Sequence, residues 1–363
     1  MESGTNMGNY LQIDLQALEH NACTVTRTVG VPVIGVVKFD GYGMTIPVAA
    51  RAWQKAGVTM FAVAESREAL ALRQAGFTED ILLMAPVGDK AVLSRLLENN
   101  IILTVSDLDN ARFYCANRGD YTLRVHVKVD TGMGRFGIRW TDTAQLTEVY
   151  KLEGLQPEGI FSHLTNTFEK EFKLSKLQLK RFLQAVQAVE AAGFAPGLRH
   201  IANSCAALRF PETWLDAVRV GSALVGSLLV PVEADLKRVH TFYAQVVAVK
   251  ALEKGDTMGY AAVCKAKKPV RAVVAAVGTS YGFAMTGAPD PYPWRDFLSY
   301  LYHLLLRYRN QPRASFNGKQ LKLIGRVGSQ YTLFDATGVD VKPGDYITVG
   351  VSLLSCPSPR VFR

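Results

Sequence analysis

The sequence has few cysteines, and they are not spaced for a disulfide framework or a structural zinc site. The 363 residues contain five, an odd number without a CxxC pair. They are Cys23, Cys115, Cys205, Cys264 and Cys356. The sequence also lacks any stretch of about 20 apolar residues without charge, which argues against a membrane-spanning helix. Its opening residues, MESGTNMGNY, lack the basic and apolar regions of a secretory signal. These absences predict a cytoplasmic protein with no metal site and no membrane association.

Concentrated positive charge is missing too, although the net charge is +9. No block of Lys and Arg and no basic stretch interleaved with aromatic residues occurs, so we do not expect nucleic-acid binding. A modest positive excess suits an enzyme with an anionic cofactor and a carboxylate substrate. The length favours two domains, and an apolar fraction of 48% allows each a core.

Residues 1–235 alternate short apolar runs with longer amphipathic stretches. The eight runs are Val31–Val37, Phe61–Ala64, Ile81–Met84, Ile101–Val105, Leu123–Val129, Gly159–Phe161, Arg199–Ala202 and Ala217–Val220. Ile46–Ala56, Ser66–Ala75 and Leu174–Ala192 have helical apolar spacing between them. Eight strands alternating with helices predict an α/β fold, a (β/α)8 TIM-type barrel.

Residues 236–363 have a different pattern, with β-rich runs separated by Gly, Pro and Lys. The runs are Phe242–Leu252, Val270–Val277, Leu321–Val327, Tyr331–Phe334 and Asp345–Val349. We predict a mainly antiparallel β domain, which residues 8–14 are expected to join. Phe297–Arg309, inside a 284–315 insertion, has helical spacing. A helix packed in the core, a dimer contact and a lid all remain open for it.

In a (β/α)8 barrel the reactive groups gather at the carboxyl ends of the strands. Lys38 ends the first run, which is apolar enough to be buried on both faces. Poor solvation would lower the pKa of its amine and make it a better nucleophile toward an aldehyde, although a surface lysine is the simpler alternative. His163 follows the sixth run, and Arg219 lies in the eighth. A structural histidine and an arginine paired with Asp216 are the alternatives for these two. Ser204, Gly221 and Ser222 would offer hydroxyl and N–H donors to a phosphate.

Five motifs in order then resemble the alanine racemase family of fold type III pyridoxal-phosphate (PLP) enzymes. They are Tyr10–Asn21 (YLQIDLQALEHN), Val36–Gly43 (VVKFDGYG), Val127–Ile138 (VKVDTGMGRFGI), His200–Ser204 (HIANS) and Arg219–Gly221 (RVG). The second resembles the motif that carries the PLP lysine. The resemblance extends almost from end to end of the chain.

The resemblance implies a role for each matched residue. Lys38 would hold PLP covalently and act as one acid–base. Arg219 would contact the pyridine nitrogen, and His163 would flank the ring. Arg135 would lie near the phenolic oxygen of the cofactor and the substrate carboxylate, oriented by Lys128, which is carbamylated in many family members. The phosphate would be held by Tyr42, Ser204, Gly221 and Ser222, with Asn203 as a supporting partner. The family also implies a homodimer in which the β domain completes the partner's site.

The second acid–base is where the sequence departs from the family. The family uses a tyrosine from the β domain, but Met258–Ala266 reads MGYAAVCKA and places Cys264 at that position. In a slipped register Tyr260 would serve instead. The simpler alternatives are a small buried apolar residue for Cys264 and a packed aromatic for Tyr260.

Residues that would line the substrate pocket are also smaller than in the family. Thr279 and Cys356 stand where tyrosines are usual, and Ser329 replaces a methionine. Ser329 and Cys356 are therefore candidate substrate-binding residues in a widened pocket. We expect the substrate to be alanine or a larger or more polar amino acid such as serine.

The predicted function is an amino-acid racemase that interconverts L- and D-enantiomers by two-base α-proton transfer. A fold type III decarboxylase is the first alternative, which Arg219 disfavours because those enzymes resemble this chain in fold but carry an acidic residue there. A PLP-binding, racemase-like protein with lost or redirected activity is the second.

Overall fold

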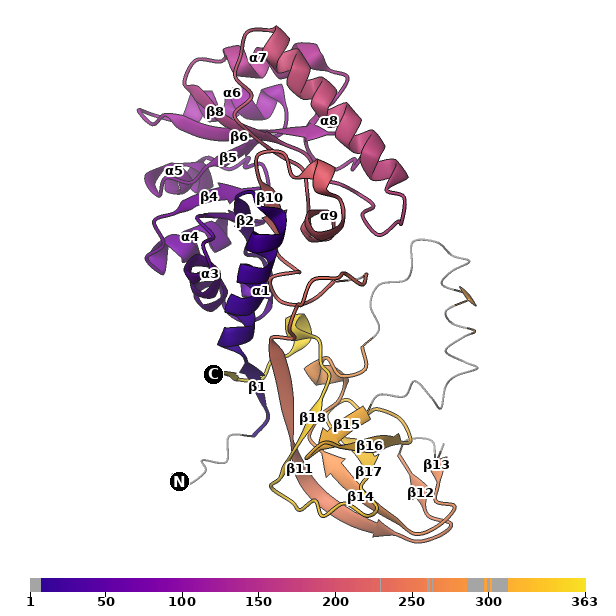
Figure 1. Ribbon diagram of the computed structural model, residues 1–363. Helices are drawn as coiled ribbons and strands as arrows, with labels where there is room; N and C mark the ends of the chain where they lie inside the picture. The colour runs from indigo at the N-terminus through magenta and orange to yellow at the C-terminus, as the bar shows by residue number, and fades with distance from the viewer. Residues whose placement is uncertain are drawn as a thin grey trace. The chain divides into compact units, whose positions relative to one another are not determined.

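The structure, a computed structural model, describes residues 8–228, 230–259, 262, 264–285, 297–298, 301 and 313–363. These residues form two compact units (Figure 1). One is Leu15–Val239, and the other joins strand β1 (Tyr10–Ile13) to the residues from His240 onward. No helix in these described ranges is long and apolar enough to cross a membrane.

The first unit is a closed ring of eight parallel strands. In chain order they are β2 (Val33–Val36), β3 (Met60–Val63), β4 (Asp80–Leu83), β5 (Leu103–Val105), β6 (Leu123–Asp130), β8 (Leu155–Phe161), β9 (Leu198–His200) and β10 (Val218–Val220). Parallel pairing runs from β10 through β2 and β3 to β4, and from β5 through β6 and β8 to β9. Single bridges at Leu82–Ile102 and His200–Ala217 join the two arcs. The predicted (β/α)8 barrel is confirmed, with a short extra strand, β7 (Ile138–Arg139), beside β6.

Helices alternate with the barrel strands, and the apolar residues that recur on one face of these helices are buried. They are α1 (Leu15–Val29), α3 (Ile46–Lys55), α4 (Ser66–Gln74), α5 (Lys90–Glu98), α6 (Leu108–Asn117), α7 (Thr143–Lys151), α8 (Lys173–Ala191) and α9 (Ser204–Arg209). Asp89, Asp107 and Asp142 start α5, α6 and α7, each accepting a backbone N–H bond from within the first turn.

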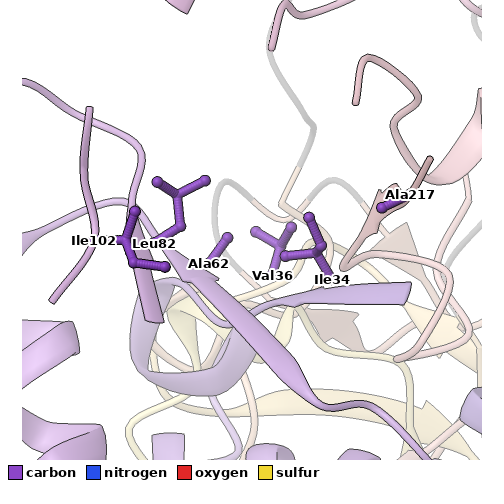
Figure 2. Packing of buried hydrophobic residues seen from close by; sticks show 6 residues of the cluster. All are labelled: Ile34, Val36, Ala62, Leu82, Ile102 and Ala217. Atoms are coloured by element: carbon purple, nitrogen blue, oxygen red, sulfur yellow. The ribbon is translucent and has the colours of Figure 1, made fainter. Parts of the chain in front are cut away.

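The apolar interior of the barrel comes from small and branched side chains of successive strands. Figure 2 shows the six buried residues of this cluster, Ile34, Val36, Ala62, Leu82, Ile102 and Ala217. Full burial of a Leu or Ile side chain contributes about 1.5–3 kcal/mol, so this cluster stabilises ring closure. A rigid ring fixes the ends of the strands that carry the polar residues.

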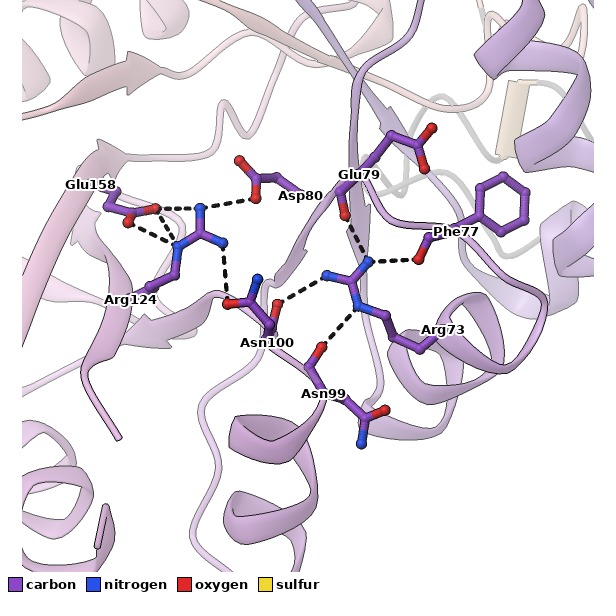
Figure 3. A network of polar contacts seen from close by, with 8 residues as sticks. All are labelled: Arg73, Phe77, Glu79, Asp80, Asn99, Asn100, Arg124 and Glu158. Carbon is purple, nitrogen blue, oxygen red and sulfur yellow. Dashed lines mark hydrogen bonds and ion pairs between the residues drawn. The ribbon is translucent and has the colours of Figure 1, made fainter. Parts of the chain in front are cut away.

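The amino ends of four strands are held by two arginines (Figure 3). Arg73 donates to the backbone carbonyls of Phe77, Glu79, Asn99 and Asn100. Arg124, at the start of β6, pairs with Asp80 of β4 and Glu158 of β8. This end of a TIM barrel serves stability, which separates the network from the carboxyl ends where we expect chemistry.

The second unit is a mainly antiparallel sheet that also closes on itself. Its strands are β1, β11 (His240–Leu252), β14 (Val270–Ala275), β15 (Arg313–Phe316), β16 (Lys319–Ile324), β17 (Thr332–Asp335), β18 (Tyr346–Val349) and β19 (Arg360–Phe362). The order is β14-β17-β16-β15-β18-β11-β1-β19, with β1 and β19 paired in parallel, and the 13-residue β11 is long enough to pair with β14 as well. A separate hairpin joins β12 (Thr257–Met258) to β13 (Cys264–Lys265). Within the segment 297–309 the described residues Phe297, Leu298 and Leu301 are helical and exposed, and the others lie outside the described residues.

Candidate active site

Lys38 follows β2 directly and begins an unusual turn. The next four residues, Phe39–Tyr42 (α2), have φ angles of 53°, 51°, 64° and 56°, all in the left-handed region. The Tyr42 N–H donates to the Lys38 carbonyl at 2.8 Å, so both ends of the turn form one unit. Non-glycine residues pay about 1–2 kcal/mol each for this conformation. Surrounding contacts must therefore hold the turn that carries Lys38 and Tyr42.

The amine of Lys38 is half-buried among like charges. Burial lowers its pKa, Arg135 lowers the pKa further, and Glu68 partly opposes both. A lowered pKa makes the neutral, nucleophilic amine more available near neutral pH.

Tyr42, Ser204 and Gly221 meet at a cradle on the same rim. A Cβ on Gly221 would lie only 2.0 Å from the Tyr42 hydroxyl, so glycine alone leaves room for it. The N–H groups of Gly221 and Ala223 point to the Ser204 hydroxyl, at 3.1 and 3.4 Å. Asn203 caps α9 by accepting the Ala206 N–H, which fixes the position of Ser204 next to it.

Arg219 of β10 is the most deeply buried charge of the site, at 3% exposed. Its guanidinium lies 2.8 Å from Nδ1 of His200 and 3.3 Å from Nδ1 of His163, and it donates to the Ser162 carbonyl. Asp216 bonds Arg199 instead, so the alternative of an Arg219–Asp216 pair does not hold.

Burial and neighbouring cations keep these groups in defined charge states. Desolvation lowers the pKa of Arg219 to about 9, which leaves it charged at neutral pH. Burial, followed by Arg219, Lys128, Arg135 and Lys38, lowers the pKa of His163 to about 3. His163 is therefore neutral, and the cations that lower its pKa are predicted site residues from three strands, β2, β6 and β10, and the loops after them.

Lys128 and Arg135 come from β6 and the loop after it. Burial, Arg219 and Arg135 lower the pKa of Lys128 to about 8. The Asp130 carboxylate accepts the N–H groups of Gly132, Met133 and Gly134, which orders the loop leading to Arg135.

The assembled residues fit an anionic phosphate ester with an aldehyde. A lysine of lowered pKa can condense with the aldehyde, and the cradle of hydroxyl and N–H donors suits the phosphate. The cations Arg135, Lys128 and Arg219 supply the complementary charge. Ser222, adjacent to Gly221, lies at the same turn.

The remaining predicted residues lie in the second unit. Cys264 is half-buried and packs against an apolar cluster that includes Met258 and Ile324. Ser329 is exposed, and its carbonyl accepts the Ser280 N–H, whereas Cys356 is 3% exposed. Tyr260 lies outside the described residues.

Two residues of this rim were not identified as site residues from the sequence. His200 ends β9 and contacts Arg219, and its place at a strand end was the available signal. Glu68 contacts the residue after Lys38, 29 positions away. The spacing of Glu65 and Glu68 indicates a helix cap but gives no sign of that distant contact.

Alanine racemases are among the solved structures that share this architecture. The chain superposes on "alanine racemase [Clostridium difficile 630]" with a TM-score of 0.85 and 22% identity, over 98% of this chain and 96% of that one. The alanine racemase from D-cycloserine-producing Streptomyces lavendulae gives a TM-score of 0.83 at 25% identity, over 99% and 98%.

Sequence comparison agrees over the whole chain. Alanine racemase of Desulforamulus reducens is 33% identical over 353 residues, covering 94% of this chain and 89% of that protein. Alanine racemase 2 of Caldanaerobacter subterraneus subsp. tengcongensis is 31% identical, with coverage of 93% and 84%. The family model for the alanine racemase N-terminal domain matches residues 13–228, and that for the C-terminal domain matches residues 239–353. The chain therefore belongs to the alanine racemase family and is an isomerase of the racemase class.

Proposed function

We propose that this protein interconverts L- and D-alanine with PLP and also accepts serine. The observation that carries the proposal is the buried Arg219 held between His163 and His200, on the rim that also holds Lys38. An arginine facing the pyridine nitrogen would disfavour its protonation, because two positive charges would then be adjacent. That restraint suits racemisation, in which a proton is returned and no other bond is broken.

The residues for PLP are those of the cradle and its neighbours. Lys38 would bind the aldehyde, Arg219 and His163 would face the ring, and the phosphate would lie among Tyr42, Ser204, Gly221 and Ser222. Bound PLP would withdraw electrons from the α-carbon of an attached amino acid and so acidify its C–H bond. Arg135 would bind the substrate carboxylate, and a carbamylated Lys128 would orient Arg135.

Racemisation needs two acid–bases on opposite faces of the α-carbon. Lys38 Nζ would exchange the proton on one face. On the other face the exchange would fall to Cys264 Sγ or to Tyr260 Oη. We propose a homodimer in which the β domain of each subunit supplies this group, and a cytoplasmic location, which suits five free cysteines.

Serine is included in the proposal because the side chains of Thr279, Ser329 and Cys356 are smaller than those usual in the family. The named relatives support alanine as the first substrate. Comparison of kcat/KM for alanine, serine, lysine and glutamate tests both points. A preference for alanine with serine next supports the proposal, and activity on lysine or glutamate alone would reject it.

Variants of the second unit identify the second acid–base. Cys264→Ala and Tyr260→Phe should differ, one of them losing exchange of the α-hydrogen of one enantiomer for solvent deuterium far more than that of the other. Release of CO2 from any amino acid would instead indicate the decarboxylase alternative. Bound PLP without turnover of any amino acid would indicate a redirected racemase-like protein.

A further inference from the structure

The carboxylate of Glu68 joins the carboxyl ends of two neighbouring barrel strands. Its Oε1 accepts the N–H of Phe39, the residue after Lys38, at 2.7 Å. Its Oε2 accepts the N–H groups of Ala64 and Glu65, after β3, at 3.0 and 3.1 Å. The side chain is almost completely buried, at 4% exposed. A buried anion with three N–H donors is a rigid anchor, because charge-assisted hydrogen bonds are stronger than neutral ones.

The Phe39 N–H is the first donor of the left-handed turn. The bonds within the turn run from the Tyr42 and Gly43 N–H groups to the carbonyls of Lys38 and Phe39. The first N–H of a helical turn needs a partner from outside it, and Glu68 supplies that partner. The Asp40 carboxylate accepts the Ile46 N–H at 3.1 Å, which ties the second residue of the turn to the start of α3. A turn with three strained non-glycine residues is thus restrained by two contacts with residues outside it.

We propose that Glu68 is a positioning residue for the reaction. Its carboxylate holds the left-handed turn so that the Lys38 amine and the Tyr42 hydroxyl keep fixed places on the rim. The inference deepens the proposed function and rests on it for the role of Lys38.

Glu68 also acts on Lys38 through its charge. The titratable and charged groups that interact electrostatically with Lys38 are Arg135, His163 and Glu68. Arg135 lowers the pKa of Lys38, Glu68 raises it, and His163 is neutral. Removal of the carboxylate should therefore lower the pKa of Lys38.

Two substitutions separate the effect of the length of the Glu68 side chain from the effect of its charge. Glu68→Gln keeps the length of the side chain but removes the charge. Its NH2 group would face backbone N–H donors in place of one carboxylate oxygen and could not accept their hydrogen bonds. Glu68→Asp keeps the charge but is one methylene shorter, so it cannot bridge Phe39 and the end of β3. Glu65→Gln is the matched control, because Glu65 forms the other half of the same capping box and does not contact Phe39.

Two measurements avoid any dependence on turnover. The first is the rate at which an amine-directed acylating reagent labels Lys38 in cofactor-free protein, followed across pH by mass spectrometry of the Lys38 peptide. The second is the affinity of the same protein for PLP, from absorbance titration. Thermal unfolding of each variant reports the common loss of helix capping.

Glu68→Gln should move the labelling profile of Lys38 to lower pH, whereas Glu68→Asp and Glu65→Gln should leave it in place. Both Glu68 variants should bind PLP at least about tenfold more weakly, the loss expected for one charge-assisted hydrogen bond. If Glu68→Gln does not fold, the PLP affinity of Glu68→Asp decides alone.

Unchanged labelling and PLP affinity, with all three variants melting alike, would overturn the inference and leave Glu68 as a helix cap. Failure of the proposed function looks different. In that case wild-type protein turns over no amino acid, while the labelling and PLP results can still follow Glu68.

Discussion

Gly221→Ala is the substitution whose effect follows most directly from the geometry. The added Cβ would lie 2.0 Å from Tyr42 Oη, 2.9 Å from its Cζ and 3.1 Å from the Val36 carbonyl oxygen. Carbon atoms in contact are normally about 3.5–4.0 Å apart, so the tyrosine ring has to withdraw by more than about 1 Å. Overpacking of this kind costs about 1–3 kcal/mol. Because Tyr42 and Gly221 form the cradle, we expect PLP to bind at least about tenfold more weakly.

The assay is absorbance titration of cofactor-free protein with PLP, alongside denaturant unfolding. Tyr42→Phe removes the closest clashing atom, so Gly221→Ala should cost less in that background, with a coupling of about 0.5 kcal/mol or more. Gly88→Ala is the control, because a Cβ there meets nothing within 4 Å. If Gly221→Ala binds PLP as tightly as Gly88→Ala, or costs the same with and without the tyrosine hydroxyl, the reasoning about the cradle is wrong.

Three further predictions concern charge states and the opposite end of the barrel. Burial and two guanidinium groups lower the pKa of Lys128 to about 8. Protein incubated with 13C-bicarbonate should therefore give a carbamate signal by NMR at pH 8.5, and the signal should fade as the amine protonates below about pH 8. A signal that persists in Lys128→Met would contradict this assignment. The buried His126 and His200 have pKa values lowered to about 3 and well below 6.5 respectively. The unfolded chain therefore binds protons below pH ~6.5 that the folded chain does not, and stability should fall on acidification toward about pH 3, by up to about 1.4 kcal/mol per pH unit for each histidine. Denaturant unfolding at pH 7 and 5 should show a smaller loss in His126→Gln, and equal losses would refute the assignment. Arg73→Met should lower the free energy of unfolding by about 2 kcal/mol or more. PLP affinity should stay unchanged, because Arg73 bonds to carbonyls at the amino ends of the strands. A loss of PLP affinity in this variant would contradict the assignment of stability to the amino ends and of chemistry to the carboxyl ends.

The barrel was predictable because its strands are short runs rich in apolar residues, several of them buried on both faces, in regular alternation with helices. The run ending in Lys38 shows the strength of the signal, since β2 lies within it. The second unit was harder to predict from the sequence. Strands β15 and β19 were not predicted, and β19 is three residues long and pairs with β1 from the other end of the chain. Such pairing is non-local and leaves no periodic trace in either segment.

The part of the candidate site that lies at the carboxyl ends of strands was predictable from the sequence. Lys38, His163 and Arg219 all lie on the carboxyl rim, as their order after strands implies. The left-handed turn was not predictable, because Phe39 and Tyr42 do not favour positive φ and are held there by contacts distant in sequence. The link from Glu68 to Phe39 is one of these, and the parallel pairing of β2 with β3 brings the two together.

The most direct test of the central claim is exchange of the α-hydrogen of L- and D-alanine for solvent deuterium, in PLP-loaded protein. The account predicts exchange from both enantiomers, with formation of the opposite enantiomer, and loss of both in Lys38→Ala. Loaded wild-type protein that exchanges neither, or a Lys38→Ala variant that exchanges as fast as wild type, would contradict it.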